Sequence, residues 1–407
     1  MTHLPLDVLV LIDDLRPMHR AKAAWFGDLA RLLPPGGTAF TTPSPLPRGS
    51  GRFACPVKRA PTFFLSARPL VRRIWRAQMR WLATHRKPGL ILAAGAHPEG
   101  ALAAELAAEL GVPYVVYAQA PELVALRPGV TTGAAEADRE VLLRADAIIV
   151  PNRASWLEAY RLGILPNRLQ EVPPGIDLER FQPGKVRPDV EQRWRQDRGS
   201  VVLSVTDGSP SFDFETVLRA FAVAQAQRKA TRLLWVAPAA PPDLAKWIRE
   251  LGLQDSVRQI PSPSAADLPE LYRLADAFLV AHREVRSAGI VQGTELSLLQ
   301  AMASGLVIVA TQTPATEEWI EDESIGIVVE SGAHTKLGKA LADVLRSREQ
   351  RADASETARR TAEERFDVRH RAAAFREFLE VLYYRRLGRG DLRAATAAAE
   401  GTARSVA

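Results

Sequence analysis

Short apolar runs of the kind that forms buried strands alternate with helical segments along the chain. Residues 8–12, 90–93 and 145–150 are such runs, and residues 100–110 between them have helical periodicity. The same alternation begins again after Pro183. Strands that alternate with helices predict parallel sheets built from βαβ units. Because 407 residues exceed what one hydrophobic core usually organises, we expect two α/β domains.

The predicted boundaries follow from this pattern. We expect an N-terminal domain over residues 1–182, a C-terminal domain over 183–368, a helix over 369–387 and a disordered tail over 388–407. Strands are expected at 200–205, 231–237, 275–280, 306–310 and 326–329, and helices at 214–227, 243–251, 295–303 and 335–346. The stretch 34–69, rich in Pro, Gly and Ser, reads as long loops.

Positive charge is concentrated near the N-terminus. The net charge is +6, yet residues 29–98 contain twelve Lys and Arg and no Asp or Glu. Within this stretch Arg72, Arg76 and Arg80 form one stripe of a predicted amphipathic helix. Two interpretations stay open: a solvated basic face, or a surface for anionic partners such as lipid head groups. Nucleic acid is not an expected partner.

The compartment is inferred from two features. Cys55 is the only cysteine, which excludes an intrachain disulfide and a cysteine-based metal cluster. The apolar run at 8–12 is too short to span a membrane and too close to acids for a signal peptide. We expect a cytoplasmic protein. A peripheral position at the inner surface of the membrane stays open as an alternative.

Three segments carry a family resemblance. Residues 145–183 (ADAIIVPNRASWLEAYRLGILPNRLQEVPPGIDLERFQP), 267–280 (DLPELYRLADAFLV) and 292–311 (QGTELSLLQAMASGLVIVAT) resemble retaining, nucleotide-sugar-dependent glycosyltransferases of family 4. The resemblance implies the GT-B fold, in which two Rossmann-like domains with parallel sheets face each other across a cleft. The C-terminal domain would bind a UDP- or GDP-linked sugar, and the N-terminal domain the acceptor. The last helix would cross back to the N-terminal domain. No metal or cofactor is implied.

The resemblance also assigns site residues, one motif at a time. Gln119 takes the place of a histidine beside the reacting sugar, and Gln292 that of a glutamate near the donor sugar. Gln300 replaces the glutamate that accepts hydrogen bonds from the ribose hydroxyls, whereas the acidic Glu318 is kept. The remaining positions assigned to the nucleotide sugar are Asp207, Gly208, Arg283, Arg286, Gly293, Thr294, Glu295 and Leu296.

Several of these positions have lost the charge that the family uses. The arginine and lysine that grip the diphosphate fall on Asp207 and Phe212, and an acid repels a diphosphate. His282, Arg283 and Arg286 lie just before the loop of Gln292, at the predicted carboxyl end of a strand, and could supply compensating positive charge. Alternatively, these three residues are ordinary solvated loop residues.

Three functions are compatible with this sequence. The first is transfer of a sugar from a nucleotide-sugar donor to an unidentified glycan, lipid or small molecule, with retention of configuration. The second is a non-catalytic GT-B protein that acts as a binding or partner subunit, in which the helix frame persists for packing alone. The third is an epimerase or phosphorylase on the same fold, although no motif for a pyridoxal-phosphate lysine is evident.

Overall fold

The computed structural model describes residues 6–13, 15, 21–34, 37–42, 53–59, 69–127, 133–195, 199–206, 208, 211–261, 263–283, 295–321 and 324–386; for 21, 59, 69–75, 133, 134, 295, 315 and 386 it describes the backbone alone. The chain forms two compact units. Unit 1 comprises Met1–Arg16, Phe26–Pro173 and Arg369–Ala407, and unit 2 comprises Pro17–Trp25 and Pro174–Val368.

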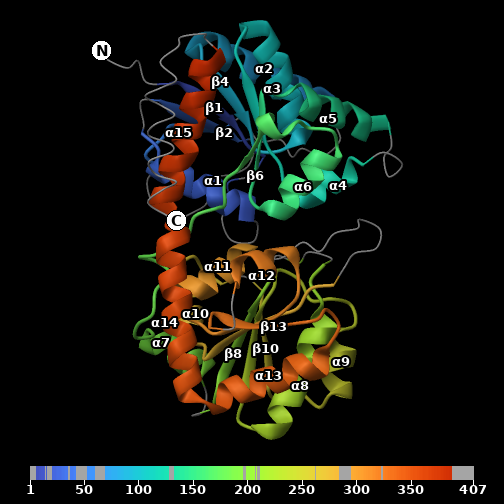
Figure 1. Ribbon diagram of the computed structural model, residues 1–407, viewed down its shortest axis with the longest axis vertical. Coiled ribbons are helices and arrows are strands. Elements are labelled where there is room, and N and C mark those ends of the chain that lie inside the picture. The colour runs from blue at the N-terminus through green and yellow to red at the C-terminus, as the bar shows by residue number, and fades with distance from the viewer. Residues whose placement is uncertain are drawn as a thin grey trace. The chain divides into compact units, whose positions relative to one another are not determined.

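Unit 1 contains a seven-stranded sheet in the order β3-β2-β1-β4-β5-β6-β7 (Figure 1). Its strands are β1 (Val8–Leu11), β2 (Thr38–Thr42), β3 (Val57–Arg59), β4 (Leu90–Ala93), β5 (Tyr114–Tyr117), β6 (Ala147–Val150) and β7 (Leu169–Glu171). Every pair is parallel, with Leu9 opposite Ile91 in the central one. The central strands are buried along their whole length, as expected for a parallel sheet covered by helices.

Most helices of unit 1 lie between these strands. They are α1 (Ala21–Leu32), whose first residues up to Trp25 are grouped with unit 2, α2 (Pro69–Arg86), a π-helical turn η1 (Ala96–Gly100), α3 (Ala101–Leu110), α4 (Ala120–Ala125), α5 (Gly133–Arg144), α6 (Arg153–Arg161), a 3-10 turn η2 (Pro166–Arg168) and the C-terminal α15 (Val368–Arg386). Phe375 and Leu379 of α15 are buried. Arg376 donates hydrogen bonds to the carbonyl of Leu6 and the hydroxyl of Thr38, both at 3.2 Å. The last helix therefore completes the first unit. The predicted tail lies outside the described residues.

Unit 2 contains a six-stranded sheet in the order β10-β9-β8-β11-β12-β13. Its strands are β8 (Val201–Val205), β9 (Arg232–Val236), β10 (Val257–Ile260), β11 (Ala277–Val280), β12 (Ile308–Thr311) and β13 (Gly326–Val329). All of its pairs are parallel as well. The strand order reverses between β8 and β11, and such a switch point is where open α/β sheets bind ligands.

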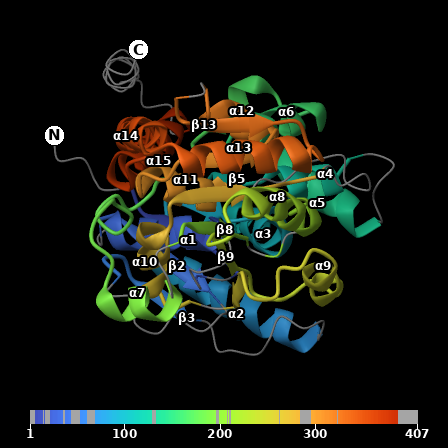
Figure 2. The same cartoon turned by 90° about the horizontal axis from the view of Figure 1, so that it is seen from below.

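The helices of unit 2 cover the two faces of this sheet. They are α7 (Pro188–Trp194), α8 (Phe214–Gln227), α9 (Leu244–Glu250), α10 (Asp267–Leu274), α11 (Glu295–Ala303), α12 (Pro314–Trp319), α13 (His334–Arg346) and α14 (Arg348–Arg365). Helix α13 packs on α8, and α14 packs on α11. Figure 2 shows the first pairing from a second direction. The second pairing matters for function, because α11 carries several predicted site residues.

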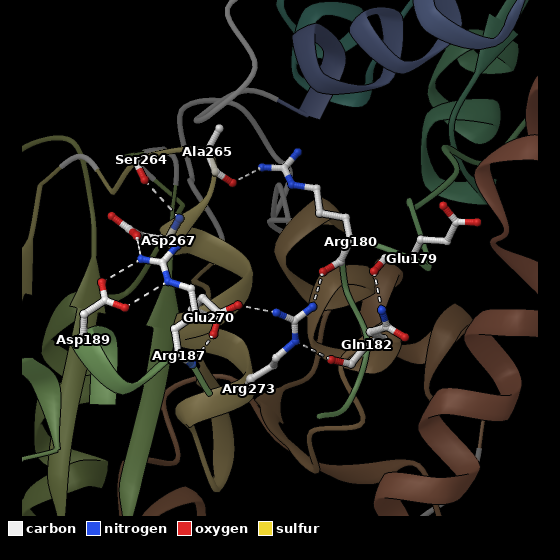
Figure 3. A network of polar contacts seen from close by, with 10 residues as sticks. All are labelled: Glu179, Arg180, Gln182, Arg187, Asp189, Ser264, Ala265, Asp267, Glu270 and Arg273. Carbon is white, nitrogen blue, oxygen red and sulfur yellow. Dashed lines mark hydrogen bonds and ion pairs between the residues drawn. The ribbon is translucent and has the colours of Figure 1, made fainter. Parts of the chain in front are cut away.

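A polar network attaches the start of unit 2 to α10 (Figure 3). The guanidinium of Arg273 donates to the carbonyl of Gln182 at 3.0 Å and forms an ion pair with the buried Glu270. Glu270 in turn accepts the backbone N–H of Arg187 at 2.8 Å. These contacts explain why residues 174–182 belong to unit 2, whereas the sequence analysis assigned them to the N-terminal domain.

Two further features differ from the sequence-based expectations. The stretch 34–69, expected to form loops, contains strands β2 and β3. Helix α14 was not predicted. Its buried face consists of Ala354, Ala358 and Ala362, and alanine at this spacing gives only a weak apolar signal among many charges.

Candidate functional site

Two loops meet at the switch point of the unit 2 sheet. One follows β8 and the other follows β11, and they are joined by an antiparallel bridge between Phe212 and His282. The backbone N–H of Arg283 also donates to the carbonyl of Ser211 at 2.8 Å. Because the carboxyl ends of parallel strands form the ligand edge of such a sheet, these joined loops are the floor of the candidate site.

Phe212 fills the interior beneath this floor. Its side chain is 1% exposed, and its ring lies 4.6 Å from that of Phe214 and 5.7 Å from that of His282. Phe214 also contacts Trp235, at 4.5 Å between ring centroids. We call these four residues the aromatic cluster. The position that corresponds to a phosphate-binding lysine in the family therefore serves packing in this chain.

His282 does not supply the positive charge that the sequence analysis considered. It is 2% exposed, and burial lowers its pKa from 6.5 to about 4, so the imidazole is neutral at physiological pH. Its backbone N–H donates to the Thr311 hydroxyl at 2.8 Å, and its carbonyl accepts from the Ser331 hydroxyl at 2.8 Å. His282 thus joins the ends of β11, β12 and the loop after β13. Arg283 has an exposed side chain, whereas Arg286 lies outside the described residues.

A tight turn follows β8. Gly208 has φ of +83°, in the left-handed region that favours glycine, and its N–H donates to the Thr206 hydroxyl at 3.1 Å. A Cβ at this position would lie 3.2 Å from Cγ of Pro238. Both the backbone angle and the space therefore require glycine. Asp207, which precedes it, lies outside the described residues.

Helix α11 keeps the family frame through its packing face. Leu299, Ala301, Met302 and Ala303 are completely buried, and Leu296 is half-buried. The predicted residues Gln292, Gly293 and Thr294 lie outside the described part of the chain, as does the side chain of Glu295. The four fully buried residues of this motif serve packing.

Gln300 on the same helix is 7% exposed and has a specific partner. The hydroxyl of Tyr272 donates to its Oε1 at 2.9 Å and lies 3.2 Å from the carbonyl of Ser297. Tyr272 is fully buried, stacked on Phe278 at 5.9 Å, and burial raises its pKa well above the ordinary value. The tyrosine therefore stays neutral, with its hydroxyl between the Gln300 amide oxygen and the Ser297 carbonyl.

Helix α12 begins with a capped turn. Thr313 and Thr316 form a reciprocal capping box, and Pro314 occupies the first turn. These residues fix the start of the helix. Glu318, the acid that is kept, lies half-buried on this helix.

A hollow of about 510 Å³ lies beside α12, at the carboxyl ends of β12 and β13. It is lined by Gln312, Glu317, Ile320, Val328, Val329, Glu330 and Lys336. None of these residues was predicted from the sequence as a site residue. Among the predicted donor residues that the structure describes, none lines this hollow.

Solved structures with the same architecture are glycosyltransferases and related enzymes. HepE of Anabaena, solved in complex with UDP-glucose, superposes with a TM-score of 0.74 at 18% identity, over 92% of this chain and 99% of that one. WaaG, a glycosyltransferase involved in lipopolysaccharide biosynthesis, superposes with a TM-score of 0.67 at 18% identity, over 91% of this chain and 99% of that one. At these identities the likeness shows the fold alone, which is GT-B.

Two family models match consecutive parts of the chain. The model described as Glycosyltransferase Family 4 matches residues 32–180, and that described as Glycosyl transferases group 1 matches residues 188–361. The chain is a family 4-like glycosyltransferase protein. The resemblance to family 4 glycosyltransferases is thereby confirmed, and retention of configuration stays a prediction.

Curated relatives match this family 4-like chain over part of their length. A GDP-mannose-dependent alpha-(1-6)-phosphatidylinositol monomannoside mannosyltransferase of Mycobacterium tuberculosis is 26% identical over 44% of this chain and 48% of its own. A D-inositol 3-phosphate glycosyltransferase of Salinispora tropica is 30% identical over 55% of this chain and 49% of its own. The chain spans about half the length of the curated relatives it matches.

Gln119 belongs to unit 1 of this family 4-like protein. It precedes α4 at the carboxyl end of β5 and is half-buried. Nearby, Glu99 is completely buried, and its Oε1 accepts the backbone N–H of Asp13 at 2.8 Å. Glu122 likewise accepts the backbone N–H of Ala96. Two carboxylates thus fix the loops at this edge of the unit 1 sheet.

The predicted basic stripe lies on α2. Arg76 pairs with Glu105 at 3.2 Å, and Arg80 pairs with Glu109 at 2.5 Å, all with partly exposed side chains. Both glutamates belong to α3, so part of the positive charge is offset within unit 1. The side chain of Arg72 lies outside the described part. Over the residues that the structure describes, each helix is too short or too polar to span a membrane.

The sequence analysis did not identify Tyr272 or Glu99. Tyr272 lies within the family-like segment 267–280, where a tyrosine at a core position indicates that its hydroxyl needs a partner. Glu99 follows His97 and Pro98 in a chain segment without strong periodicity, so its burial carried no sequence signal.

Proposed function

We propose that this protein transfers a sugar from a UDP- or GDP-linked donor to an acceptor with retention of configuration. The observation that carries the proposal is the pair of family matches, which together cover most of both units. A likeness confined to unit 2 would support nucleotide binding alone. A likeness to both units supports the combination of donor and acceptor domains that sugar transfer requires.

In this proposal the donor lies along the carboxyl edge of the unit 2 sheet. Gln300 contacts the ribose, Glu318 and Gln292 lie near the donor sugar, and Gln119 lies beside the reacting carbon. The remaining donor contacts are Asp207, Gly208, Arg283, Arg286, Gly293, Thr294, Glu295 and Leu296. No metal or prosthetic group takes part.

The charge of the diphosphate must be balanced differently from the family pattern. Phe212 and His282 contribute no positive charge, because one is apolar and the other is held neutral by burial. Two sources remain in the proposal: the N-terminus of α11, whose dipole favours anions, and the guanidinium groups of Arg283 and Arg286. Catalysis then consists mainly of positioning the donor and stabilising the departing diphosphate.

Release of free nucleotide from UDP-glucose and GDP-mannose measures this activity, and NMR of the product anomer tests retention. Gly208→Ala should reduce turnover at least tenfold, since it forces a side chain into a left-handed turn against Pro238. Gly252→Ala is the matched control, because Gly252 has φ of +67° with open space around its Cβ position. Equal turnover in the two variants would contradict a donor site at the β8 turn.

A second candidate function has a specific observation in its favour. The aromatic cluster occupies the place of a phosphate-binding side chain, which is what a non-catalytic binding subunit would tolerate. Such a protein would show no nucleotide release with any donor, and Gly208→Ala would alter its stability alone. The turnover assay therefore separates the two candidates.

The proposed acceptor contains an inositol or a similar polyol. The support is that the relatives from Mycobacterium tuberculosis and Salinispora tropica both have inositol-containing acceptors in their names. Myo-inositol, inositol 3-phosphate and phosphatidylinositol in mixed micelles should be compared as acceptors in the nucleotide-release assay. Release that none of them stimulates above donor hydrolysis would exclude this acceptor class.

A further inference from the structure

Helix α6 of unit 1 and the turn after it expose a group of large apolar side chains. Of the five large hydrophobic side chains that are exposed among the described residues, three lie here: Leu157 at 38%, Tyr160 at 53% and Leu165 at 58%. Single exposed hydrophobic residues are ordinary, whereas a contiguous group marks a surface that meets a partner.

The helical spacing makes this group contiguous. Residues three and four positions apart are neighbours on a helix, so Arg153, Trp156, Leu157, Tyr160 and Arg161 form one continuous strip. The ring contacts follow the same spacing. Trp156 stacks on Tyr160 with 5.6 Å between ring centroids, and the guanidinium of Arg153 lies 4.4 Å from the Trp156 ring.

A tight turn keeps Leu165 close to the end of the helix. Gly163 has φ of +92°, and its N–H donates to the carbonyl of Tyr160 at 2.9 Å. The N–H of Ile164 donates to the carbonyl of Ala159 at 3.2 Å. This pair of hydrogen bonds is a common glycine-dependent end of a helix. We call the strip together with Leu165 the α6 patch.

The α6 patch is basic as well as apolar. Glu158 is the one acid in the sequence of α6, and it is buried. Its two carboxylate oxygens pair with Arg127 and Arg161, both at 2.5 Å. The exposed strip therefore has an arginine at each end, Arg153 and Arg161, and no acid between them. Helix α2 differs, because its described arginines pair with partly exposed glutamates.

We propose that the α6 patch is an interfacial docking site for a lipid bilayer with anionic head groups. Tryptophan and tyrosine favour the boundary between head groups and acyl chains, since each has an apolar ring with a polar edge. The leucines enter the acyl boundary beside them, and the arginines contact lipid phosphates, whose geometry suits a guanidinium. Over the described residues each helix is too short or too polar to span a membrane, so this attachment is peripheral.

The shape and charge of the patch favour a bilayer over a protein partner. A protein interface needs complementary pockets for its anchor side chains, whereas the convex face of one short helix can lie on a planar surface without them. The two arginines provide charge complementarity to anionic lipids. The proposal goes beyond sugar transfer and does not depend on it.

Vesicle co-sedimentation of the full-length protein at low salt tests the proposal. The vesicles contain phosphatidylcholine alone or mixed with phosphatidylglycerol, and the wild type should bind the mixed vesicles at least about fivefold more strongly. Leu157→Ser with Leu165→Ser should weaken this binding at least about fivefold, because less apolar surface leaves water. Leu32→Ser is the matched control, since this leucine of α1 is 40% exposed, and it should bind like the wild type.

Arg153→Gln supplies an independent readout. It should weaken binding to the mixed vesicles about two- to fivefold at low salt and have little effect at high salt, which screens the charge but not the apolar contacts. Arg346→Gln, at an exposed position of α13, is its control and should leave binding unchanged. Circular dichroism melting verifies that each variant is folded.

Two results would overturn the proposal and leave sugar transfer intact. One is a wild type that stays in the supernatant with both kinds of vesicle, and the other is a double leucine variant that binds as strongly as the wild type. If the patch instead joins two copies of the chain, size-exclusion chromatography will show a concentration-dependent dimer that the double leucine variant abolishes. Such a dimer without vesicle binding would also overturn the proposal.

Discussion

The ligand edges of the two sheets differ in the groups that they bury: one buries a hydrogen-bonded carboxylate, and the other buries an apolar ring beside a neutral imidazole. In unit 1, the carboxylate of Glu99 is completely buried and is retained together with its partner, the backbone N–H of Asp13. In unit 2, the corresponding edge contains Phe212 and a neutral His282 in place of charged groups. A buried charge is stable only with partners, whereas an apolar replacement needs none.

The comparison teaches how the family frame can persist while its charges change. Unit 1 keeps its carboxylates because they hold loops, and their removal would leave buried N–H groups unsatisfied. In unit 2 the aromatic cluster packs the floor of the candidate site without a buried charge.

Phe212→Lys should have the largest effect on stability. An ammonium would be buried among aromatic rings without an anionic partner, which we expect to cost at least about 4 kcal/mol of unfolding free energy. Phe212→Leu is the control and should cost no more than about 1.5 kcal/mol. Urea unfolding measures both. A lysine variant as stable as the leucine variant would show that this side chain reaches solvent, and the aromatic cluster would then not define the floor.

Stability should depend on pH through His282. Its pKa in the folded protein is about 4, below the ordinary value of 6.5, so below pH 6.5 the unfolded chain binds a proton that the folded chain does not. The stabilisation is complete above pH 6.5 and is lost as the pH falls towards 4, by roughly 3 kcal/mol at most.

Urea unfolding between pH 4 and pH 8 checks this prediction in three proteins. His282→Leu should flatten the profile relative to the wild type in that window. His85→Leu, at an exposed position, should not. Parallel profiles for the wild type and the His282 variant would show that the imidazole is not held neutral.

Glu99→Ala should destabilise unit 1 by about 1–3 kcal/mol, because the N–H of Asp13 loses its acceptor. Glu99→Gln keeps an acceptor oxygen and should cost less than about 1 kcal/mol. Thermal unfolding of the two variants compares these effects. If glutamine is as damaging as alanine, the charge of Glu99 matters more than its hydrogen bond.

The smallest effect concerns the basic stripe of α2. Arg76 and Arg80 are paired with exposed glutamates, and such pairs contribute only about 0–1 kcal/mol, so the arginines can exchange partners. Arg76→Gln with Arg80→Gln should reduce co-sedimentation with anionic liposomes two- to fivefold at low salt. Arg144→Gln, on α5, is the control. Equal recovery of all three proteins in the supernatant would end the membrane-surface interpretation.

Much of the fold followed from periodicity. Buried parallel strands are continuous apolar runs bounded by turns, and this pattern predicted strands β8, β9, β11 and β12. Helix α11 was also predicted from the sequence. Strands β2 and β3 were missed, since one is rich in threonine and the other has three residues. Neither has a pattern distinguishable from that of a loop.

The candidate site was less predictable than the fold. Motif spacing placed Gln300 on α11, but only the structure shows that Tyr272 binds it. Spacing also aligned Phe212 with a lysine, and it could not show that the side chain turns towards Phe214. The same holds for His282, whose charge state depends on burial and is not encoded in the local sequence.

We propose that unit 2 binds a nucleotide sugar although Phe212 and the neutral His282 beneath its floor supply no positive charge. The most direct test is a calorimetric titration of the purified, full-length protein with UDP-glucose and with GDP-mannose. The account predicts a saturable isotherm for at least one donor, with one site and a Kd of the order of 1 μM to 1 mM, the range usual for enzyme substrates. Absence of binding to both donors at millimolar concentration, in protein that melts cooperatively, would contradict it.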